Sequence, residues 1–287
     1  VRKDNTYKNL YLIGFYIKPD QLHNDHATII SQYKDKGAKI ILHFVGADIY
    51  WLRKFSYESL KYLSGALRIS CDHILCENEM AQKELKEMGI PSEIVPIPPY
   101  SDYEVKPLPK DFKCSIFLTD HSDFDKYCYD PTISIVRAMP DIQFTAYGDA
   151  GGNLHYPNLD WKGNLSREEW KEYVYANSCL LRLVRHDTTP LANNEFMLAG
   201  RDVISNIPGE CNYYIDTSGK EELNTWDIFQ EGLNSYNWPK TKESVIHAIR
   251  KIRDVQMGMN ILSGDSLDSM RVMRSKELSV RFNRDQY

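Results

Sequence analysis

The stretch 179–206, CLLRLVRHDTTPLANNEFMLAGRDVISN, predicts a strand, a loop, a helix and a second strand. Its apolar run at 179–184 is short and ends abruptly in polar residues, which is typical of a buried parallel strand. Pro190 suits the first turn of a helix, and Gly200 can end that helix after 191–199. Ligands bind beyond the carboxyl ends of strands in open α/β sheets, and a helix N-terminus there attracts anions such as a diphosphate.

Two acidic residues of this unit, Asp187 in the loop and Glu195 on the helix, are separated by seven others. On spacing alone they are a capping aspartate and a solvated helical glutamate. The string RHDTTPLANNEFMLAGRDVISN, however, resembles the donor-site signature of retaining GT-B glycosyltransferases of the family-4-like group, the group 1 glycosyl transferases. The resemblance implies that Glu195 binds the donor ribose. It also implies that Asp187, which stands where the family more often has Glu, contacts the transferred sugar as a catalytic or a donor-positioning residue.

Composition places the chain among soluble globular proteins, because 42% of its 287 residues are hydrophobic and 26% are charged. Its net charge of −5 gives no basis for broad electrostatic binding to nucleic acid, which is therefore not an expected partner. Its six cysteines are scattered, which favours reduced thiols in an intracellular protein. No apolar run reaches the ~18–20 residues that span a bilayer, so we expect a cytoplasmic protein, with peripheral membrane contact left open.

Alternating strand and helix patterns predict an α/β fold with parallel sheets. In the terms of the resemblance, these form two Rossmann-like domains that face a cleft (GT-B), with a reduced N-terminal domain. We expect an acceptor-side domain at 1–104, a linker at 105–111 and a nucleotide-sugar-binding domain at 112–270. The segment 271–287 resembles the terminal helix that returns to the first domain in GT-B proteins.

In the first half, the strand ILHFV runs directly into a polar turn, Gly46-Ala47-Asp48. This pattern resembles the strand ending in His-x-x-Gly-x-Asp in the acceptor half of the same glycosyltransferases. A single histidine such as His43 is often a satisfied structural residue, but at a strand's carboxyl end beside a glycine it can line a site. The resemblance implies a catalytic role for His43 and acceptor-side positions for Gly46 and Asp48.

In the second half, Lys126 precedes a helix and a Pro-Asp turn in KYCYDPTISIVRAMPDIQFTAYGD, as a basic residue does in that family. A loop lysine is usually only solvated, whereas the resemblance implies that Lys126 contacts the donor diphosphate as part of the catalytic set. Side chains alternate along a strand, so Arg182 and Arg185 point to opposite faces and we expect one of them to reach the ligand. The other donor-binding candidates are His186, Thr188, Thr189, Gly148, Asp149 and Lys162.

The function that the resemblance implies is that of a retaining, metal-independent glycosyltransferase, a hexosyltransferase-like enzyme of class EC 2.4. A nucleotide-diphosphate sugar is the donor and co-substrate, no cofactor is implied, and the acceptor is a glycan, a lipid-linked hydroxyl or another hydroxyl. The short first half and Thr188, where the family usually has Gly, favour an alternative: a catalytically weakened GT-B protein that binds a nucleotide sugar or glycan without turnover. A Rossmann dehydrogenase is not supported, because no G-x-G-x-x-G opens a helix after an early strand.

Overall fold

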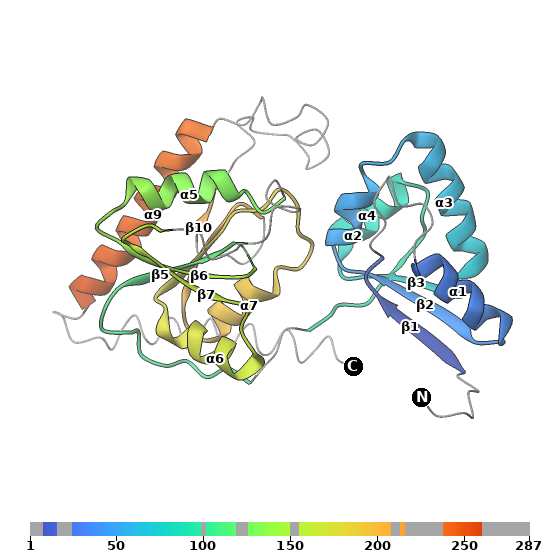
Figure 1. Cartoon of the computed structure of the whole chain (residues 1–287), viewed down its shortest axis with the longest axis horizontal. Helices are drawn as coiled ribbons and strands as arrows, with labels where there is room; N and C mark the ends of the chain where they lie inside the picture. The colour runs from blue at the N-terminus through green and yellow to red at the C-terminus, as the bar shows by residue number, and fades with distance from the viewer. Residues whose placement is uncertain are drawn as a thin grey trace. The chain divides into compact units, whose positions relative to one another are not determined.

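The computed structural model describes residues 8–15, 25–98, 102–118, 126–149, 155–207, 213–215 and 238–259. Contacts divide the chain into two compact units, each with its own parallel sheet and helices (Figure 1). Unit 1 comprises Val1–Pro98 and His186–Pro190, and unit 2 comprises Pro99–Arg185 and Leu191–Tyr287. The expected linker at 105–111 lies inside unit 2, and the expected C-terminal helix at 271–287 lies outside the described residues.

Unit 1 is built on a four-stranded parallel sheet in the order β1-β2-β3-β4. Its strands are β1 (Asn9–Ile13), β2 (Lys39–Phe44), β3 (His73–Cys76) and β4 (Glu93–Ile94). The connecting helices are α1 (Asp25–Asp35), α2 (Ala47–Leu52), α3 (Tyr57–Ser70) and α4 (Glu79–Glu87). Neighbouring strands follow one another in sequence and such crossovers are right-handed, so the helices lie on one face of the sheet (Figure 1).

Alternation along β2 determines which face of this sheet is the core. Ile40, Leu42 and Phe44 are fully buried in one cluster with residues from all four helices. On the opposite face, Tyr11 and Ile13 of β1 are 47% and 62% exposed. In the described part of unit 1, helices therefore cover a single face of the sheet.

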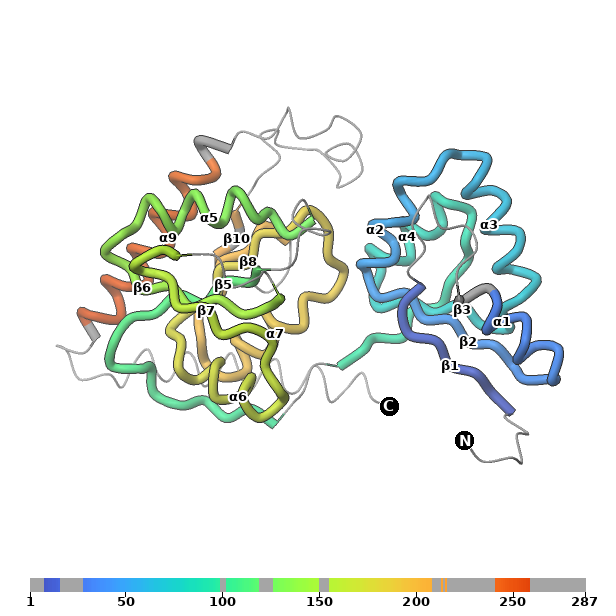
Figure 2. The backbone as a smooth tube through the Cα atoms, in the orientation of Figure 1, coloured from blue at the N-terminus to red at the C-terminus, as the bar shows by residue number. Residues whose placement is uncertain are grey.

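Unit 2 is built on a six-stranded parallel sheet in the order β10-β9-β8-β5-β6-β7, and Figure 2 traces the backbone through it. Its strands are β5 (Lys113–Phe117), β6 (Gln143–Tyr147), β7 (Leu159–Gly163), β8 (Cys179–Arg182), β9 (Asp202–Ser205) and β10 (Tyr213–Tyr214). Its helices are α5 (Tyr129–Ala138), α6 (Arg167–Ala176), α7 (Leu191–Leu198) and α9 (Trp238–Met259).

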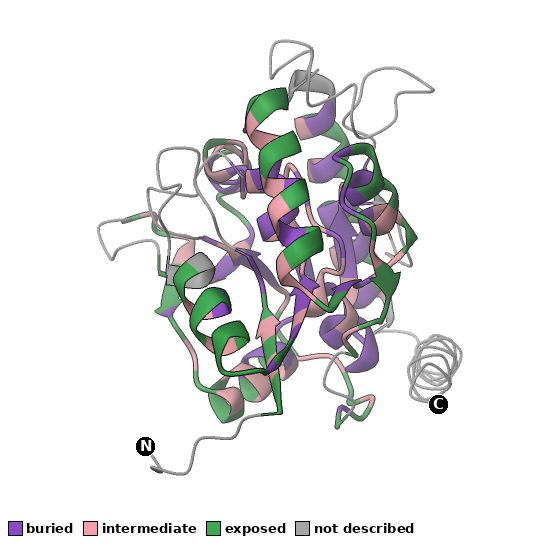
Figure 3. Cartoon of the chain, turned by 90° about the vertical axis from the view of Figure 1, so that its right-hand side faces the viewer, coloured by how far each residue is buried: buried purple, intermediate pink, exposed green. Residues whose placement is uncertain are grey.

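The strand order of unit 2 reverses between β5 and β8, which places helices on both faces of the sheet. One buried cluster joins the sheet to α5 and α9, and a second joins it to α6 and α7. Buried residues accordingly concentrate in the strands, and exposed residues lie on the outer sides of the helices (Figure 3). Ligands of such sheets bind at the carboxyl ends of the strands where the order reverses, which is here beside β5 and β8.

The strand, helix and strand predicted from 179–206 are confirmed as β8, α7 and β9. β8 ends at Arg182, earlier than the apolar run predicted, although Leu183 and Val184 are also buried. Gly200 has a φ of +76°, as expected for a glycine that ends a helix. Within the described parts of the chain, no helix combines the length and the apolar character that crossing a bilayer requires.

Candidate functional site

The carboxyl ends of three neighbouring strands in unit 2 bring aromatic rings and cations together. β5 ends at Phe117, β6 at Tyr147 and β8 at Arg182, and β5 pairs with both of the other strands. The guanidinium carbon of Arg182 lies 5.5 Å from the centre of the Phe117 ring and 5.8 Å from that of Tyr127. Lys126 Nζ lies 4.5 Å from the centre of the same Tyr127 ring. Two positive charges therefore gather around one tyrosine at this edge of the sheet.

Lys126 is buried, in contrast to the solvated loop lysine that its sequence context allows. Its Nζ donates a hydrogen bond to the hydroxyl of Tyr127 at 3.0 Å. Its carbonyl accepts a hydrogen bond of 2.7 Å from the amide of Arg185, which joins Lys126 to the chain that follows β8. Burial raises the pKa of the neighbouring Tyr147 to about 12, and the charge of Arg182 works against this. Tyr147 is therefore neutral at physiological pH, and the charges of the cluster come from its cations.

Three further donor-site candidates lie at the ends of β6 and β7. Gly148 has a φ of +112°, and a Cβ there would lie 1.9 Å from the carbonyl oxygen of Leu118, so only glycine allows this approach. Asp149 is exposed. Lys162 is also exposed, and its Nζ pairs with Asp160 Oδ2 at 2.6 Å. Donor binding by Gly148, Asp149 and Lys162 stays a prediction.

Glu195 lies on α7 with its side chain 6% exposed, and two residues of α6 donate hydrogen bonds to it. Arg167 Nη1 binds Glu195 Oε1 at 3.1 Å, and Trp170 Nε1 binds Glu195 Oε2 at 2.5 Å. Burial raises the pKa of Glu195, while Trp170 and Arg167 lower it. Neither Arg167 nor Trp170 was predicted, because in the sequence each reads only as a residue near the start of an amphipathic helix.

In unit 1, the loop His186–Pro190 packs against residues that follow β3. The hydroxyl of Thr188 donates a hydrogen bond to Glu77 Oε2, and both side chains are buried. Asn78 Nδ2 donates to the carbonyl of Thr188 at 2.6 Å and to the hydroxyl of Thr189 at 3.4 Å. The two threonines, expected to bind the donor, are thus held by the first residues after β3.

The carboxylate of Glu77 lies near two other acids, Asp187 and Asp48. The pKa of Glu77 is raised to about 7, mainly by burial and to a smaller extent by the charges of Asp187 and Asp48, while the hydrogen bond from Thr188 works against this rise. Asp187 itself is half-buried. Glu77 was not predicted as a site residue, because the sequence around a glutamate that follows a strand does not show that two other acids will lie near it.

His186 belongs to a buried ionic chain in the same unit. His186 Nε2 donates to Glu84 Oε2 at 2.8 Å, and Arg53 Nη2 pairs with Glu84 Oε1 at 2.7 Å. Burial lowers the pKa of Arg53, and the charge of Glu84 raises it. These contacts give His186 a role in fixing the loop, whereas donor binding by His186 stays a prediction.

Gly46 and Asp48, the acceptor-side candidates, form the turn after β2. A Cβ on Gly46 would lie 2.5 Å from the hydroxyl of Thr188, and its φ is +83°, so the position requires glycine. Asp48 is buried and accepts hydrogen bonds of 3.0 Å from the amides of Phe15 and Val45. Burial raises the pKa of Asp48 and these amides lower it. Acceptor binding by Gly46 and Asp48 stays a prediction.

His43, the acceptor-side catalytic candidate, is 1% exposed at the end of β2. Its Nδ1 shares a hydrogen bond of 2.5 Å with the hydroxyl of Tyr11. Burial lowers the pKa of His43, and a hydrogen bond with the backbone of Val95 offsets part of this effect. The geometry is that of a packed histidine, and its catalytic role stays a prediction.

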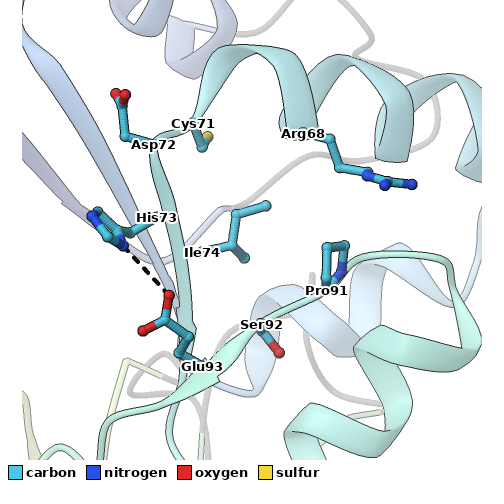
Figure 4. A pocket seen from close by; sticks show the side chains of 8 residues that line it. All are labelled: Arg68, Cys71, Asp72, His73, Ile74, Pro91, Ser92 and Glu93. Carbon is cyan, nitrogen blue, oxygen red and sulfur yellow. Dashed lines mark hydrogen bonds and ion pairs between the residues drawn. The ribbon is translucent and has the colours of Figure 1, made fainter.

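A pocket of about 300 Å³ lies at the opposite, amino-terminal ends of β3 and β4 (Figure 4). His73 Nδ1 and Glu93 Oε1 lie 3.4 Å apart in a hydrogen bond beside it, and Ile74 and Pro91 supply apolar surface. None of the predicted site residues lines it. Among the described residues, no three His, Cys, Asp or Glu side chains gather as metal ligands would.

No protein-family model and no curated protein matches the chain. Solved structures do match it at probability 1.00. The pneumococcal O-GlcNAc transferase GtfA, in complex with UDP and GlcNAc, is 11% identical with a TM-score of 0.53; the match covers 90% of this chain and 54% of that one. Anabaena HepE, in complex with UDP and glucose, is 12% identical with a TM-score of 0.55, covering 89% and 73% of the two chains. The fold is GT-B.

A third GT-B structure, described as trehalose-6-phosphate from E. coli bound with UDP-2-fluoro glucose, is 10% identical with a TM-score of 0.52. That match covers 96% of this chain and 69% of the other. At such identities the similarity establishes the fold, and it confirms the predicted α/β fold with two Rossmann-like domains. The chain spans only about half of the pneumococcal protein, at 54%.

Proposed function

We propose that the chain is a glycosyltransferase that moves a sugar from a nucleotide-diphosphate sugar to an acceptor hydroxyl. The observation that carries the proposal is the convergence of Lys126 and Arg182 on Tyr127, at the carboxyl ends of the strands where the order of the sheet reverses. A departing diphosphate develops negative charge, and prearranged cations at such an edge stabilise that charge. The named structural neighbours, which hold UDP or a UDP-sugar, support the same donor class.

In this proposal each candidate residue has a distinct task. Arg182 and Lys126 bind the diphosphate, and the Glu195 carboxylate accepts hydrogen bonds from the ribose hydroxyls. Asp187 contacts the transferred sugar or positions the donor, and His43 assists on the acceptor side. The transfer retains the configuration of the sugar, with the leaving phosphate taking up the proton of the attacking hydroxyl, and the protein works in the cytoplasm.

Metal independence is part of the proposal, because two protein cations are available to offset the charge of the diphosphate. The sequence contains one Asp-x-Asp, at 123–125, a motif that clamps a metal in another glycosyltransferase architecture, and it lies outside the described residues. Donor turnover should therefore be compared in EDTA and in added Mg²⁺ or Mn²⁺. Equal rates support the proposal, and activity that requires the metal contradicts this part of it.

A second candidate is a GT-B protein that binds a nucleotide sugar or glycan without turnover. The observation that favours it is the low exposure of His43 and Glu195, because His43 Nδ1 and each carboxylate oxygen of Glu195 already have a protein partner. Incubation with UDP-, GDP- and ADP-sugars, with release of nucleoside diphosphate as the readout, separates the two. Release from one donor supports the transferase; tight binding without release supports the binding protein; and neither binding nor release contradicts both.

A further inference from the structure

Arg167 is the first residue of α6, and its guanidinium donates hydrogen bonds to Glu195 and to residues near the start of unit 2. Its Nη1 donates to Glu195 Oε1 at 3.1 Å and to the hydroxyl of Tyr103 at 3.0 Å. Its Nη2 donates to Asp102 Oδ1 at 2.9 Å, and Lys171 Nζ donates to Asp102 Oδ2 at 2.8 Å. The guanidinium is thus fixed from three directions, and one of its bonds is directed to Glu195.

Trp170 supplies the second donor, and its indole is fixed by aromatic neighbours. Its ring stacks on Tyr173 with an interplanar angle of 18° and a centroid distance of 5.6 Å. The rings of Tyr147 and Phe196 lie 4.6 and 6.0 Å away. Rotation of the indole would break these contacts, so Nε1 stays directed at Glu195 Oε2, 2.5 Å away.

The carboxylate of Glu195 keeps part of its capacity to accept hydrogen bonds. A carboxylate offers about four acceptor positions, two on each oxygen. Among the described residues, each oxygen receives one donor, Arg167 on Oε1 and Trp170 on Oε2. One acceptor position therefore remains on each oxygen, which matches the two neighbouring hydroxyls of a ribose.

We propose that Arg167 and Trp170 are positioning residues for ribose recognition, because they orient the Glu195 carboxylate so that each oxygen accepts one ribose hydroxyl. This inference rests on the proposed function, since it concerns the ribose of the proposed nucleotide donor. It adds that selectivity for ribose over 2′-deoxyribose depends on the two α6 side chains, through Glu195. The opposing explanation is that the contacts only stabilise the fold of unit 2.

Ribose selectivity separates these explanations, since a purely structural contact would leave it unchanged. Calorimetry measures the affinity of UDP, GDP and ADP, each against its 2′-deoxy counterpart, for the wild-type chain and for Arg167→Met, Trp170→Phe and Lys171→Met. Trp170→Phe keeps an aromatic ring and removes only the N–H donor. Lys171→Met is the matched control, because Lys171 binds Asp102 as Arg167 does but its hydrogen bonds in the described residues do not involve Glu195.

Wild type should prefer the ribonucleotide by about tenfold or more, the worth of a hydrogen bond to a charged group. Arg167→Met and Trp170→Phe should reduce this preference to about threefold or less, Arg167→Lys should restore part of it, and Lys171→Met should keep it.

If a folded Trp170→Phe variant keeps the preference of wild type for the ribonucleotide, the inference is overturned. Binding by wild type without any preference overturns it as well, while the proposed donor binding survives. If wild type binds none of the nucleotides, the proposed function itself fails.

Discussion

The hydroxyl of Thr188 donates a hydrogen bond to the carboxylate of Glu77, although the two residues are 111 positions apart in the chain. Asn78 reinforces the contact, because its Nδ2 donates to the carbonyl of Thr188 at 2.6 Å. The loop His186–Pro190 is thereby fixed to the carboxyl end of β3 within unit 1. That loop carries Asp187, whose charge adds to the effect of burial on Glu77.

Glu77 should make the stability of the protein depend on pH. Its folded-state pKa of about 7 lies above the ordinary value of 4.5, so the folded chain binds the proton more tightly than the unfolded chain does. The stability that this proton provides is fully present below the unfolded pKa and is lost as the pH rises through the folded pKa. The complete loss is about 3 kcal/mol, at 1.36 kcal/mol for each pKa unit.

Glu77→Gln removes this titration and can still accept the hydrogen bond from Thr188. Urea unfolding should therefore show the variant to be more stable than wild type by about 1–3 kcal/mol at pH 8, and nearly equal to it at pH 4. Glu79→Gln, an exposed residue in the first turn of α4, serves as the control and should show no such difference. Equal effects of Glu77→Gln at both pH values would refute the assignment.

Alanine substitutions at Gly46 and Gly37 test whether Gly46 lies close to Thr188. Gly46 and Gly37 have φ angles of +83° and +77°, but a Cβ on Gly37 meets nothing within 4 Å, whereas one on Gly46 meets Thr188. Alanine at either position carries backbone strain of about 1–3 kcal/mol. Gly46→Ala should cost about 1–3 kcal/mol more than Gly37→Ala because of overpacking. Equal melting temperatures for the two variants would show that Thr188 does not lie against Gly46.

The sequence predicts the elements around 179–206 because the signals for them are local. An apolar run defines β8, Pro190 suits the start of α7, and Gly200 suits its end. Alternating strand and helix patterns predict parallel α/β sheets in the same way. The GT-B architecture, in contrast, is implied by the resemblance of this stretch to the donor-site signature of those glycosyltransferases.

The partners of the site residues, in contrast, come from distant parts of the chain and have no local signal. Arg167 lies 28 positions from Glu195, and Thr188 lies 111 positions from Glu77. The pairing of Tyr11 with His43 arises only when β1 and β2 join. Periodicity shows which face of a strand or helix is buried, but it does not show which polar residue will face it.

The buried chain Arg53–Glu84–His186 should respond strongly to the loss of its central acid. The side chains of Arg53 and Glu84 are 1% and 3% exposed, so Glu84→Leu removes a carboxylate that pairs with a buried cation. Removing one member of such a pair costs about 3–5 kcal/mol, whereas replacing both with apolar residues is far less costly. Urea unfolding should show Arg53→Met/Glu84→Leu to be more stable than Glu84→Leu alone. Additive losses in the double variant would contradict this coupling.

Arg182 should contribute to the binding of the diphosphate and little to that of the nucleoside. Arg182→Met should weaken the binding of a nucleoside diphosphate roughly tenfold or more, the worth of a charge-assisted hydrogen bond, and leave the uncharged nucleoside nearly unaffected. Arg137→Met is the control, because Arg137 is an exposed residue of α5 that donates to Tyr156. Calorimetry that finds the same loss for nucleoside and diphosphate would place Arg182 away from the phosphates.

Unit 2 should bind a nucleoside diphosphate through Glu195. Calorimetric titration of UDP, GDP and ADP into wild type and Glu195→Ala tests this binding. Wild type should bind one of the three with one-to-one stoichiometry, and Glu195→Ala, still folded, should bind it at least about tenfold more weakly because a charged acceptor of hydrogen bonds is lost. Equal affinity in the two proteins would show that Glu195 does not contact the nucleotide, and no binding by wild type would refute the nucleotide site itself.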